Sequence, residues 1–401
     1  MLSHLRTFLS GDYAGVDGIG PRGESPSSQR PRILIIRAGA IGDTLMATPL
    51  VRALRIAFPN AYLVFMCSSA ARDVLKHNPR LDRVVGLEYR HVPVGLSPEK
   101  KGIIRWLRAL DLDWALALES HRSFLDLACR VNAARLAAYD AIPARSIERV
   151  PFDPIKHCIE NHLDAGEVLG AKPAGLDMEL YLPPALKADV QRRLNHAGIG
   201  SGGLLVGLHA GWGRRPQTLE HTRLRSWPPE RFAMVARWLT ENLGARVVLT
   251  GSGNDRPLAE FIARHAAVPC LNLAGDLSLL ELAALIDRLN LYVAVDSGPA
   301  HMAAALGTPL VTLWGPGIFQ QTRPLAGRGT VHIVRHEVHC SPCYGTPLMK
   351  SCRDNICMKQ IEVAEVQEAI IGSLAKGGRG LPSKTLPAII ETRSAGAPTN
   401  A

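Results

Sequence analysis

The sequence predicts an α/β protein made of two doubly wound domains, and three observations indicate this fold. The chain has 401 residues, more than a single hydrophobic core usually serves. Residues 32–37 form a short, nearly continuous apolar run, as expected of a strand buried on both faces of a parallel sheet. The alternation of strand and helix that begins there starts again after Pro183-Pro184 and the glycine-rich residues 198–203. Two such halves imply two Rossmann-like domains that face each other across a cleft.

The first domain is expected over residues 31–190. A glycine-containing turn at residues 38–43 follows the first strand, and apolar residues then recur at helical spacing. Pro49 fits the first position of a helix that begins near Thr48, and the alternative is that it kinks the helix. Two further strands are expected, at residues 61–66 and 114–118.

The second domain is expected over residues 200–361. A helix over residues 230–243 has Gly244 well placed as its C-terminal stop. Ser278 and Glu281 have the spacing of a capping box and open another helix. Apolar runs predict the strands of the second sheet, at residues 204–209, 246–250, 291–295, 310–313 and 331–334.

The ends of the chain and its composition disfavour several classes of protein. Residues 1–30 and 377–401 are expected to be flexible extensions, and residues 362–376 a last amphipathic helix. No run of about eighteen apolar residues is present, so no segment is expected to span a bilayer. Residues 1–10 lack the apolar core of a signal peptide. We therefore expect a cytoplasmic protein whose eight cysteines are kept reduced.

The charge of the chain predicts an anionic partner. The formal net charge is +10 and the pI is near 9.4. Phosphorylated substrates, a phospholipid surface and nucleic acid would all be attracted to such a protein. The basic residues are scattered, however, and no recognition-helix or aromatic-ladder pattern accompanies them. Nucleic acid is therefore not expected to be the partner.

The strongest motif runs from an apolar strand into Asp296, Ser297 and Gly298, with Pro299 and His301 in the helix that follows. Proline suits the first turn of a helix because its missing N–H would have no partner there. A helix that begins at the carboxyl end of a parallel strand offers free backbone N–H groups and the positive end of its dipole, which is where open α/β folds bind phosphates. The alternative is that Asp296 or Ser297 only caps the helix.

The second motif is the turn after the first strand, which contains Gly39, Gly42 and Asp43. Its spacing differs from the Gly-x-Gly-x-x-Gly fingerprint, which disfavours a nicotinamide cofactor. The glycines permit a tight turn and the close approach of a substrate. Asp43 can then serve as a general base that takes a proton from a sugar hydroxyl. The alternative is an N-cap aspartate without a chemical role.

Four segments, in this order, resemble glycosyltransferase family 9, the ADP-heptose:lipopolysaccharide heptosyltransferases. They are the turn with Asp43 and the following Thr48-Pro49, residues 272–275, residues 296–301, and residues 313–316. The likeness extends over most of residues 32–375. It implies the GT-B architecture, an inverting reaction and no cofactor required for catalysis. It also implies a role in lipopolysaccharide core biosynthesis, with transfer of a heptose or related sugar from a nucleotide-diphosphate donor, ADP-heptose, to a core-type acceptor.

The resemblance assigns roles to individual positions of this sequence. Asp43 becomes the catalytic base of an acceptor-binding N-terminal domain, in which Gly42 and Arg122 are expected to contact the anionic acceptor. The C-terminal domain is expected to bind the nucleotide sugar. The residues expected in this donor site are Arg225, Gly275, Asp296, Ser297, Gly298 and His301.

The sequence departs from the family pattern at two positions. Arg225 stands where a phosphate-contacting lysine is usual, which keeps the charge but changes its geometry to a planar fork. Gly253 stands near where core heptosyltransferases carry a nucleotide-binding glutamate, and Asn254 and Asp255 are the candidates to replace it. The stretch 212–223 is longer and more basic than usual and is a candidate acceptor contact.

A cysteine-rich loop is expected over residues 336–358. It contains one Cys-x2-Cys pair and a second, more loosely spaced pair, formed by Cys340, Cys343, Cys352 and Cys357. These thiols could hold a structural zinc, with His336 or His339 as alternate ligands. A cluster of surface thiols and reversible disulfides are the alternatives.

The expected reaction is a single displacement at the anomeric carbon. Asp43 takes the acceptor proton while the nucleotide diphosphate leaves toward Arg225 and the helix start at Ser297. A lipid-linked, anionic acceptor would bring the basic enzyme to the cytoplasmic face of the inner membrane as a peripheral protein. Two other classes compete. The absent fingerprint disfavours a Rossmann-type NAD-dependent oxidoreductase, and the presence of Asp43 with residues 296–301 argues against a catalytically silent sugar-nucleotide-binding protein.

Overall fold

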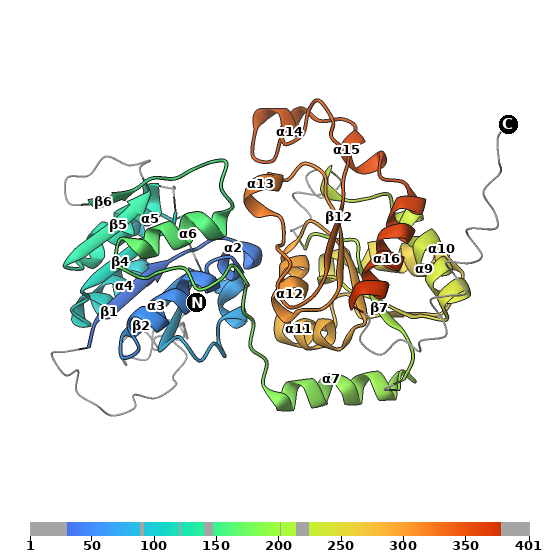
Figure 1. The fold of residues 1–401 in the computed structure, drawn as a ribbon, viewed down its shortest axis with the longest axis horizontal. Helices are drawn as coiled ribbons and strands as arrows, with labels where there is room; N and C mark the ends of the chain where they lie inside the picture. Colours follow the sequence, from blue (N-terminus) through green and yellow to red (C-terminus); the bar gives the residue numbers. More distant parts are fainter. Residues whose placement is uncertain are drawn as a thin grey trace. The chain divides into compact units, whose positions relative to one another are not determined.

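The computed structural model describes residues 30–88, 92–119, 122–139, 147–200, 202–213 and 224–377. Its contacts divide the chain into two compact units (Figure 1). The N-terminal unit is Met1–Tyr181 with Gln320–Thr322, and the C-terminal unit is Leu182–Phe319 with Arg323–Ala401. The two predicted flexible extensions fall outside the described residues, apart from the single residues Arg30 and Gly377.

The N-terminal unit is built on a six-stranded sheet in which every neighbouring pair of strands is parallel. The strand order is β3-β2-β1-β4-β5-β6, which reverses between β1 and β4. Such a switch point is where open α/β sheets bind their ligands. The strands are β1 (Arg32–Ile36), β2 (Tyr62–Ser68), β3 (Arg83–Leu87), β4 (Trp114–Ala117), β5 (Arg135–Tyr139) and β6 (Ile147–Val150).

The helices of this unit cover both faces of the sheet, so that the central strands are buried along almost their whole length. Helix α3 begins at Thr48 with Pro49 in its first turn, as one of the two sequence alternatives predicted. The helical segments are α2 (Ile41–Leu45), α3 (Thr48–Ala57), η1 (Ser69–Val74), η2 (Val94–Leu96), α4 (Pro98–Ala109), α5 (Arg122–Val131) and α6 (Cys158–Glu167).

The C-terminal unit repeats the same design. Its six strands are again parallel, in the order β12-β11-β10-β7-β8-β9, so that β7 and β10 flank the switch point. The α/β, doubly wound prediction is confirmed for both halves of the chain. The strands are β7 (Leu205–His209), β8 (Arg246–Leu249), β9 (Cys270–Asn272), β10 (Leu291–Val295), β11 (Leu310–Leu313) and β12 (Val331–Val334).

The helices of the C-terminal unit begin and end at the residues that the sequence marks. Gly244 adopts the left-handed conformation (φ 59°) at the end of α9, and Ser278 Oγ accepts a hydrogen bond from the Glu281 N–H (3.3 Å) at the start of α11. The helical segments are α7 (Pro184–His196), α9 (Pro229–Leu243), η4 (Gly253–Asp255), α10 (Arg256–Ala266), α11 (Leu279–Arg288), α12 (Gly298–Leu306), α13 (Phe319–Thr322), α14 (Pro347–Ser351), α15 (Ile356–Lys359) and α16 (Val363–Gly377). None of the helices in the described ranges is long and apolar enough to cross a bilayer.

The division between the units falls after Tyr181, whereas the sequence analysis extended the first domain to residue 190. Helix α7 belongs to the C-terminal unit because it packs on α11. Gln191 Oε1 accepts a hydrogen bond from Arg288 Nε (2.6 Å), and Lys187 pairs with Asp287 (2.9 Å). Pro183 and Pro184 are the N-cap and the first residue of α7.

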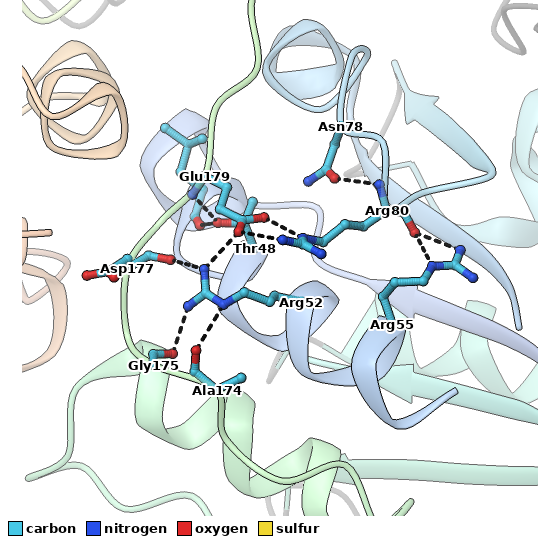
Figure 2. Close-up of polar contacts among 10 residues, drawn as sticks. Thr48, Arg52, Arg55, Asn78, Arg80, Ala174, Gly175, Asp177 and Glu179 are labelled. Carbon is cyan, nitrogen blue, oxygen red and sulfur yellow. Dashed lines mark hydrogen bonds and ion pairs between the residues drawn. The ribbon is translucent and has the colours of Figure 1, made fainter. Parts of the chain in front are cut away.

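A buried carboxylate fixes the last residues of the N-terminal unit to α3 (Figure 2). Glu179 accepts hydrogen bonds from Arg52 (2.9 Å) and Arg80 (3.0 Å), and its backbone N–H donates to Thr48 Oγ1 (2.8 Å). Arg52 also donates to the backbone carbonyls of Ala174, Gly175 and Asp177. One arginine of α3 therefore holds the chain segment that leads to the unit boundary.

Candidate active-site residues

Asp43 lies in the first turn of α2, at the carboxyl end of β1. Its Oδ2 accepts a hydrogen bond from the Ala40 N–H (2.8 Å), and its Oδ1 pairs with Arg37 Nη2 (3.0 Å). A Cβ on Gly39 would come within 2.5 Å of the Asp43 side chain, so the turn requires glycine there. The Asp43 side chain is 30% exposed. Asp43 is thus the third residue of α2 and not its N-cap, which is Ala40. A carboxylate with about four lone-pair sites can still accept a substrate proton.

Arg37 holds two carboxylates at once. It follows β1, and its Nη1 pairs with Oε2 of Glu119 (2.9 Å), which lies just beyond the neighbouring strand β4. Burial by itself lowers the pKa of Arg37, but the charges of Asp43 and Glu119 outweigh it and raise that pKa. The sequence analysis missed both Arg37 and Glu119. The signal it passed over is that both residues lie at the carboxyl ends of strands in one sheet.

The other titratable groups around Arg37 are uncharged at neutral pH. Tyr139 OH and His162 Nδ1 share a hydrogen bond of 2.6 Å. Burial lowers the pKa of His162 well below its usual value and raises that of Tyr139. Burial also raises the pKa of the Cys158 thiol to about 11. The local charge is therefore carried by Arg37 and its two carboxylate partners.

In the C-terminal unit, the predicted helix start follows β10 directly. Ser297 is the N-cap residue of α12, yet its Oγ makes no capping hydrogen bond. This hydroxyl is buried and has no hydrogen-bond partner among the described residues. The capping alternative therefore does not account for the Ser297 side chain. Gly298 is the first residue of α12, and His301 lies buried in its first turn.

Arg225 lies next to this helix start, because its Nη2 pairs with Oδ2 of the buried Asp296. The Arg225 side chain is only 9% exposed. Its Cζ lies 4.2 Å from the ring centre of Trp212 and 4.4 Å from that of Tyr344, within cation–π range. Within the part of the chain that the structure describes, its Nε is buried and has no hydrogen-bond partner. Arg225 and Ser297 therefore each carry a buried donor group, and their binding of an anion stays a prediction.

Gly275 brings two loops of the sheet edge together. Its N–H donates to the Gly251 carbonyl (2.9 Å), its φ is +81°, and a Cβ there would lie 2.8 Å from Gly253 Cα. Only glycine satisfies both constraints. Gly275 therefore shapes the loop after β8, and direct contact with a donor stays a prediction.

Asp255 does not replace the missing glutamate of the family pattern. Its Oδ1 accepts hydrogen bonds from the backbone N–H groups of Trp212 (3.2 Å) and Gly213 (3.3 Å), and its Oδ2 accepts from Ser252 N (2.8 Å) and Oγ (2.7 Å). The carboxylate is buried and bound on both oxygens, so its role is to join the loops after β7 and β8. Asn254 is exposed and remains the other candidate.

The predicted acceptor contacts are only partly described. Gly42 lies buried in α2 beside Asp43. Arg122 begins α5, but its side chain lies outside the described part of the chain, as do residues 214–223 of the basic stretch. Their roles stay predictions.

The four cysteines of the loop do not support the expected zinc. Cys343 and Cys357 are buried, Cys340 and Cys352 are partly buried, and all are free thiols. Among the described residues, no group of three or more His, Cys, Asp or Glu side chains is arranged to hold a metal ion. His336, an expected alternate ligand, instead pairs with Glu365 (3.0 Å).

Comparison with known proteins points to one enzyme family. The family model described as glycosyltransferase family 9 (heptosyltransferase) matches residues 217–351. The chain is 28% identical over 287 residues to lipopolysaccharide heptosyltransferase 3 of Escherichia coli, covering 68% of this chain and 80% of that protein. It is 27% identical over 324 residues to lipopolysaccharide heptosyltransferase 2 of Salmonella typhimurium, covering 75% and 87%.

The fold is also similar to a solved member of this group. The structure of Escherichia coli ADP-heptose lps heptosyltransferase II matches with a TM-score of 0.67 at 22% identity, over 86% of this chain and 99% of that one. This likeness supports the two-domain GT-B architecture.

Proposed function

We propose that this chain is a glycosyltransferase of family 9 that transfers a heptose from ADP-heptose to a lipopolysaccharide-core-type acceptor, by an inverting reaction that needs no metal; the similarity to heptosyltransferases supports the proposal. The observation that carries the proposal is the pair of unused, buried donors at the start of α12, Ser297 Oγ and Arg225 Nε. Leaving buried donors without partners costs about 1–3 kcal/mol each, which a bound diphosphate would recover.

The donor site is proposed at the carboxyl edge of β10. The N-terminus of α12 supplies partial positive charge, and Arg225 supplies a full one. The substitution of arginine for the usual lysine suits this arrangement, because a guanidinium has five N–H donors. Nη2 stays on Asp296 while Nε remains for a phosphate oxygen. Charge that develops on the leaving diphosphate is met by groups already in position.

Asp43 is proposed as the general base. The hydrogen bonds that Asp43 accepts from Arg37 and from the Ala40 N–H fix the orientation of its carboxylate. In the proposed reaction Asp43 takes the proton of the acceptor hydroxyl as the oxygen attacks the anomeric carbon, and the C–O bond to the diphosphate breaks.

The names of the relatives indicate a lipopolysaccharide acceptor, and the positive charge of this chain is compatible with an anionic acceptor of that kind. A net charge of +10 favours an anionic acceptor and peripheral contact with an anionic membrane surface at the cytoplasmic face of the inner membrane. Association with anionic vesicles that falls as ionic strength rises would support this docking, and association indifferent to salt would count against it.

A nucleotide screen tests the proposed donor. We expect ADP to raise the melting temperature of the full chain more than UDP, GDP or NAD does, because a ligand that binds only the folded state stabilises it. Preference for UDP or GDP would change the donor and keep the site. Stabilisation by NAD alone would favour the oxidoreductase alternative.

The Asp43→Asn variant tests the proposed base. Asparagine keeps the shape and a carbonyl oxygen for the Ala40 N–H but cannot take the proton. We expect an unchanged ADP-induced shift and a loss of heptose transfer of about a hundredfold or more. The control is Asp177→Asn, an exposed position in the same unit, which should retain full turnover. Normal turnover by Asp43→Asn would remove Asp43 from the mechanism.

A further inference from the structure

The cysteine-rich segment, residues 340–358, packs on the residues around Arg225. Cys343 and Met349 form a small buried cluster with Leu224, the residue before Arg225, and Tyr344 packs against it. On the other side, Asn355 Nδ2 donates a hydrogen bond to the Ser226 carbonyl (2.9 Å). The segment therefore touches the chain immediately before and immediately after Arg225.

Tyr344 is held by its backbone at the carboxyl edge of the sheet. Its N–H and that of Cys343 both donate to the Pro316 carbonyl, at 2.9 Å and 3.2 Å. Ser341 Oγ donates to the Gly315 carbonyl (2.9 Å). These bonds join the segment to the turn after β11, so the Tyr344 ring is carried by a fixed backbone.

Trp212 reaches the same guanidinium from the loop after β7. Its N–H and that of Gly213 are bound by the buried Asp255. A Cβ on Gly211 would come within 2.2 Å of Asp255, so the close approach of this loop to the carboxylate depends on glycine. The ring centres of Trp212 and Tyr344 are 6.2 Å apart, while each lies little more than 4 Å from Arg225 Cζ. The rings therefore lie on adjacent sides of the guanidinium.

This packing restricts the orientation of Arg225. A free arginine side chain loses about 2 kcal/mol of rotamer entropy when it is fixed. Here the rings of Trp212 and Tyr344 and the carboxylate of Asp296 fix the Arg225 side chain before any ligand binds. The buried Nε of the guanidinium makes no hydrogen bond to a described residue. The cysteines contribute through packing, since Cys343 lies in the cluster that carries Tyr344.

We propose that residues 340–358 are a positioning element of the donor site, in which Tyr344, together with Trp212, holds Arg225 in the orientation that binds the donor diphosphate. The proposal rests on the proposed function, because it requires that Arg225 bind a nucleoside diphosphate. The role that we propose for residues 340–358 does not require a bound metal. Tyr344 and Trp212 act through Arg225.

The test is a double-mutant cycle on ADP binding, measured by titration calorimetry with the full chain. Tyr344→Leu should weaken ADP binding about tenfold, and Tyr344→Phe, which keeps the ring, should stay within about twofold of the unaltered protein. In an Arg225→Ala background, Tyr344→Leu should have no further effect. Leu348→Ala, an exposed position in the same segment, is the matched control and should bind ADP normally.

Each contrary result has a distinct meaning. Unchanged ADP binding by Tyr344→Leu overturns the positioning role, as does an equal loss in Tyr344→Phe, which would implicate the hydroxyl. A loss that persists without Arg225 means that Tyr344 acts elsewhere. If Tyr344→Leu does not fold, the same ADP titration is made with Trp212→Leu and Trp212→Phe, because Trp212 contacts Arg225 from the loop after β7. If the unaltered protein binds no nucleoside diphosphate, the proposed function fails and the inference fails with it.

Discussion

Arg37 is the residue on which the environment of the proposed base depends. It is 15% exposed and is shared between Asp43 and Glu119, of which Glu119 is 11% exposed. Two carboxylates around one guanidinium leave a net negative charge of one. Oε1 of Glu119 is buried, and none of the described residues forms a hydrogen bond with it. Loss of the arginine would therefore leave two carboxylates without a counter-ion in a largely buried place.

Arg37→Met should destabilise the protein by about 3 kcal/mol, because removal of one partner from a buried pair leaves uncompensated charge. Arg37→Met combined with Glu119→Leu should recover part of that loss, since one of the two stranded carboxylates is removed as well. Urea unfolding of the single and double variants measures both effects. A double variant less stable than Arg37→Met would show that Glu119 is held by contacts other than Arg37.

At the scale of elements, two serines at helix starts separate capping from ligand binding. Ser278 Oγ accepts the Glu281 N–H at the start of α11, whereas Ser297 Oγ at the start of α12 makes no such bond. The two sequences differ in the same sense, because Glu281 completes a capping box with Ser278, whereas Ala300 stands at the corresponding position after Ser297.

Ser278→Ala should therefore cost about 1 kcal/mol of stability and leave ADP binding unchanged. Ser297→Ala should cost little stability, because no cap is lost, but should weaken ADP binding severalfold as one donor to the diphosphate disappears. Thermal unfolding with and without ADP distinguishes the two. Equal destabilisation by both substitutions, with normal ADP binding by Ser297→Ala, would return Ser297 to a capping role.

The whole fold was largely predictable because parallel strands buried on both faces read as apolar runs. The central strands β1, β2, β7 and β10 were all found this way. Four strands were not predicted: β3, β6 and β9, which lie at sheet edges, and β5, which lies inside the N-terminal sheet. Of these, β6 and β9 are short and only partly buried, so their sequences carry a weaker apolar signal.

The motifs of the candidate site could be predicted from the sequence, but the residues that contact their arginines, Arg37 and Arg225, could not. Asp43 and residues 296–301 stand in local patterns of strand, turn and helix start. Glu119 and Tyr344 come into contact with Arg37 and Arg225 only through the order of strands and the path of a long segment. Such pairings have no signature in the spacing of residues along the chain.

The last residues of the N-terminal unit offer a test of stability at the scale of the whole molecule (Figure 2). Burial by itself raises the pKa of Glu179, but the hydrogen bonds and charges of Arg80 and Arg52 outweigh it and lower that pKa below the ordinary value. A carboxyl group whose pKa is lowered by folding stabilises the folded state above its unfolded pKa, about 4.3. This contribution is lost as the pH falls through the folded pKa.

Glu179→Gln should therefore lower the free energy of unfolding by about 2 kcal/mol at pH 7, because Arg52 and Arg80 lose their buried counter-ion. The difference from the unaltered protein should shrink as the pH falls below about 4, because Glu179 is protonated first in the unfolded state and only at lower pH in the folded state, where its pKa is lowered. Chemical unfolding at several pH values measures it, with Asp177→Asn as the control, since Asp177 is exposed and joins the network only through its backbone carbonyl. A difference that stays constant down to pH 3 would mean that the shape of the Glu179 side chain, and not its charge, holds this segment to α3.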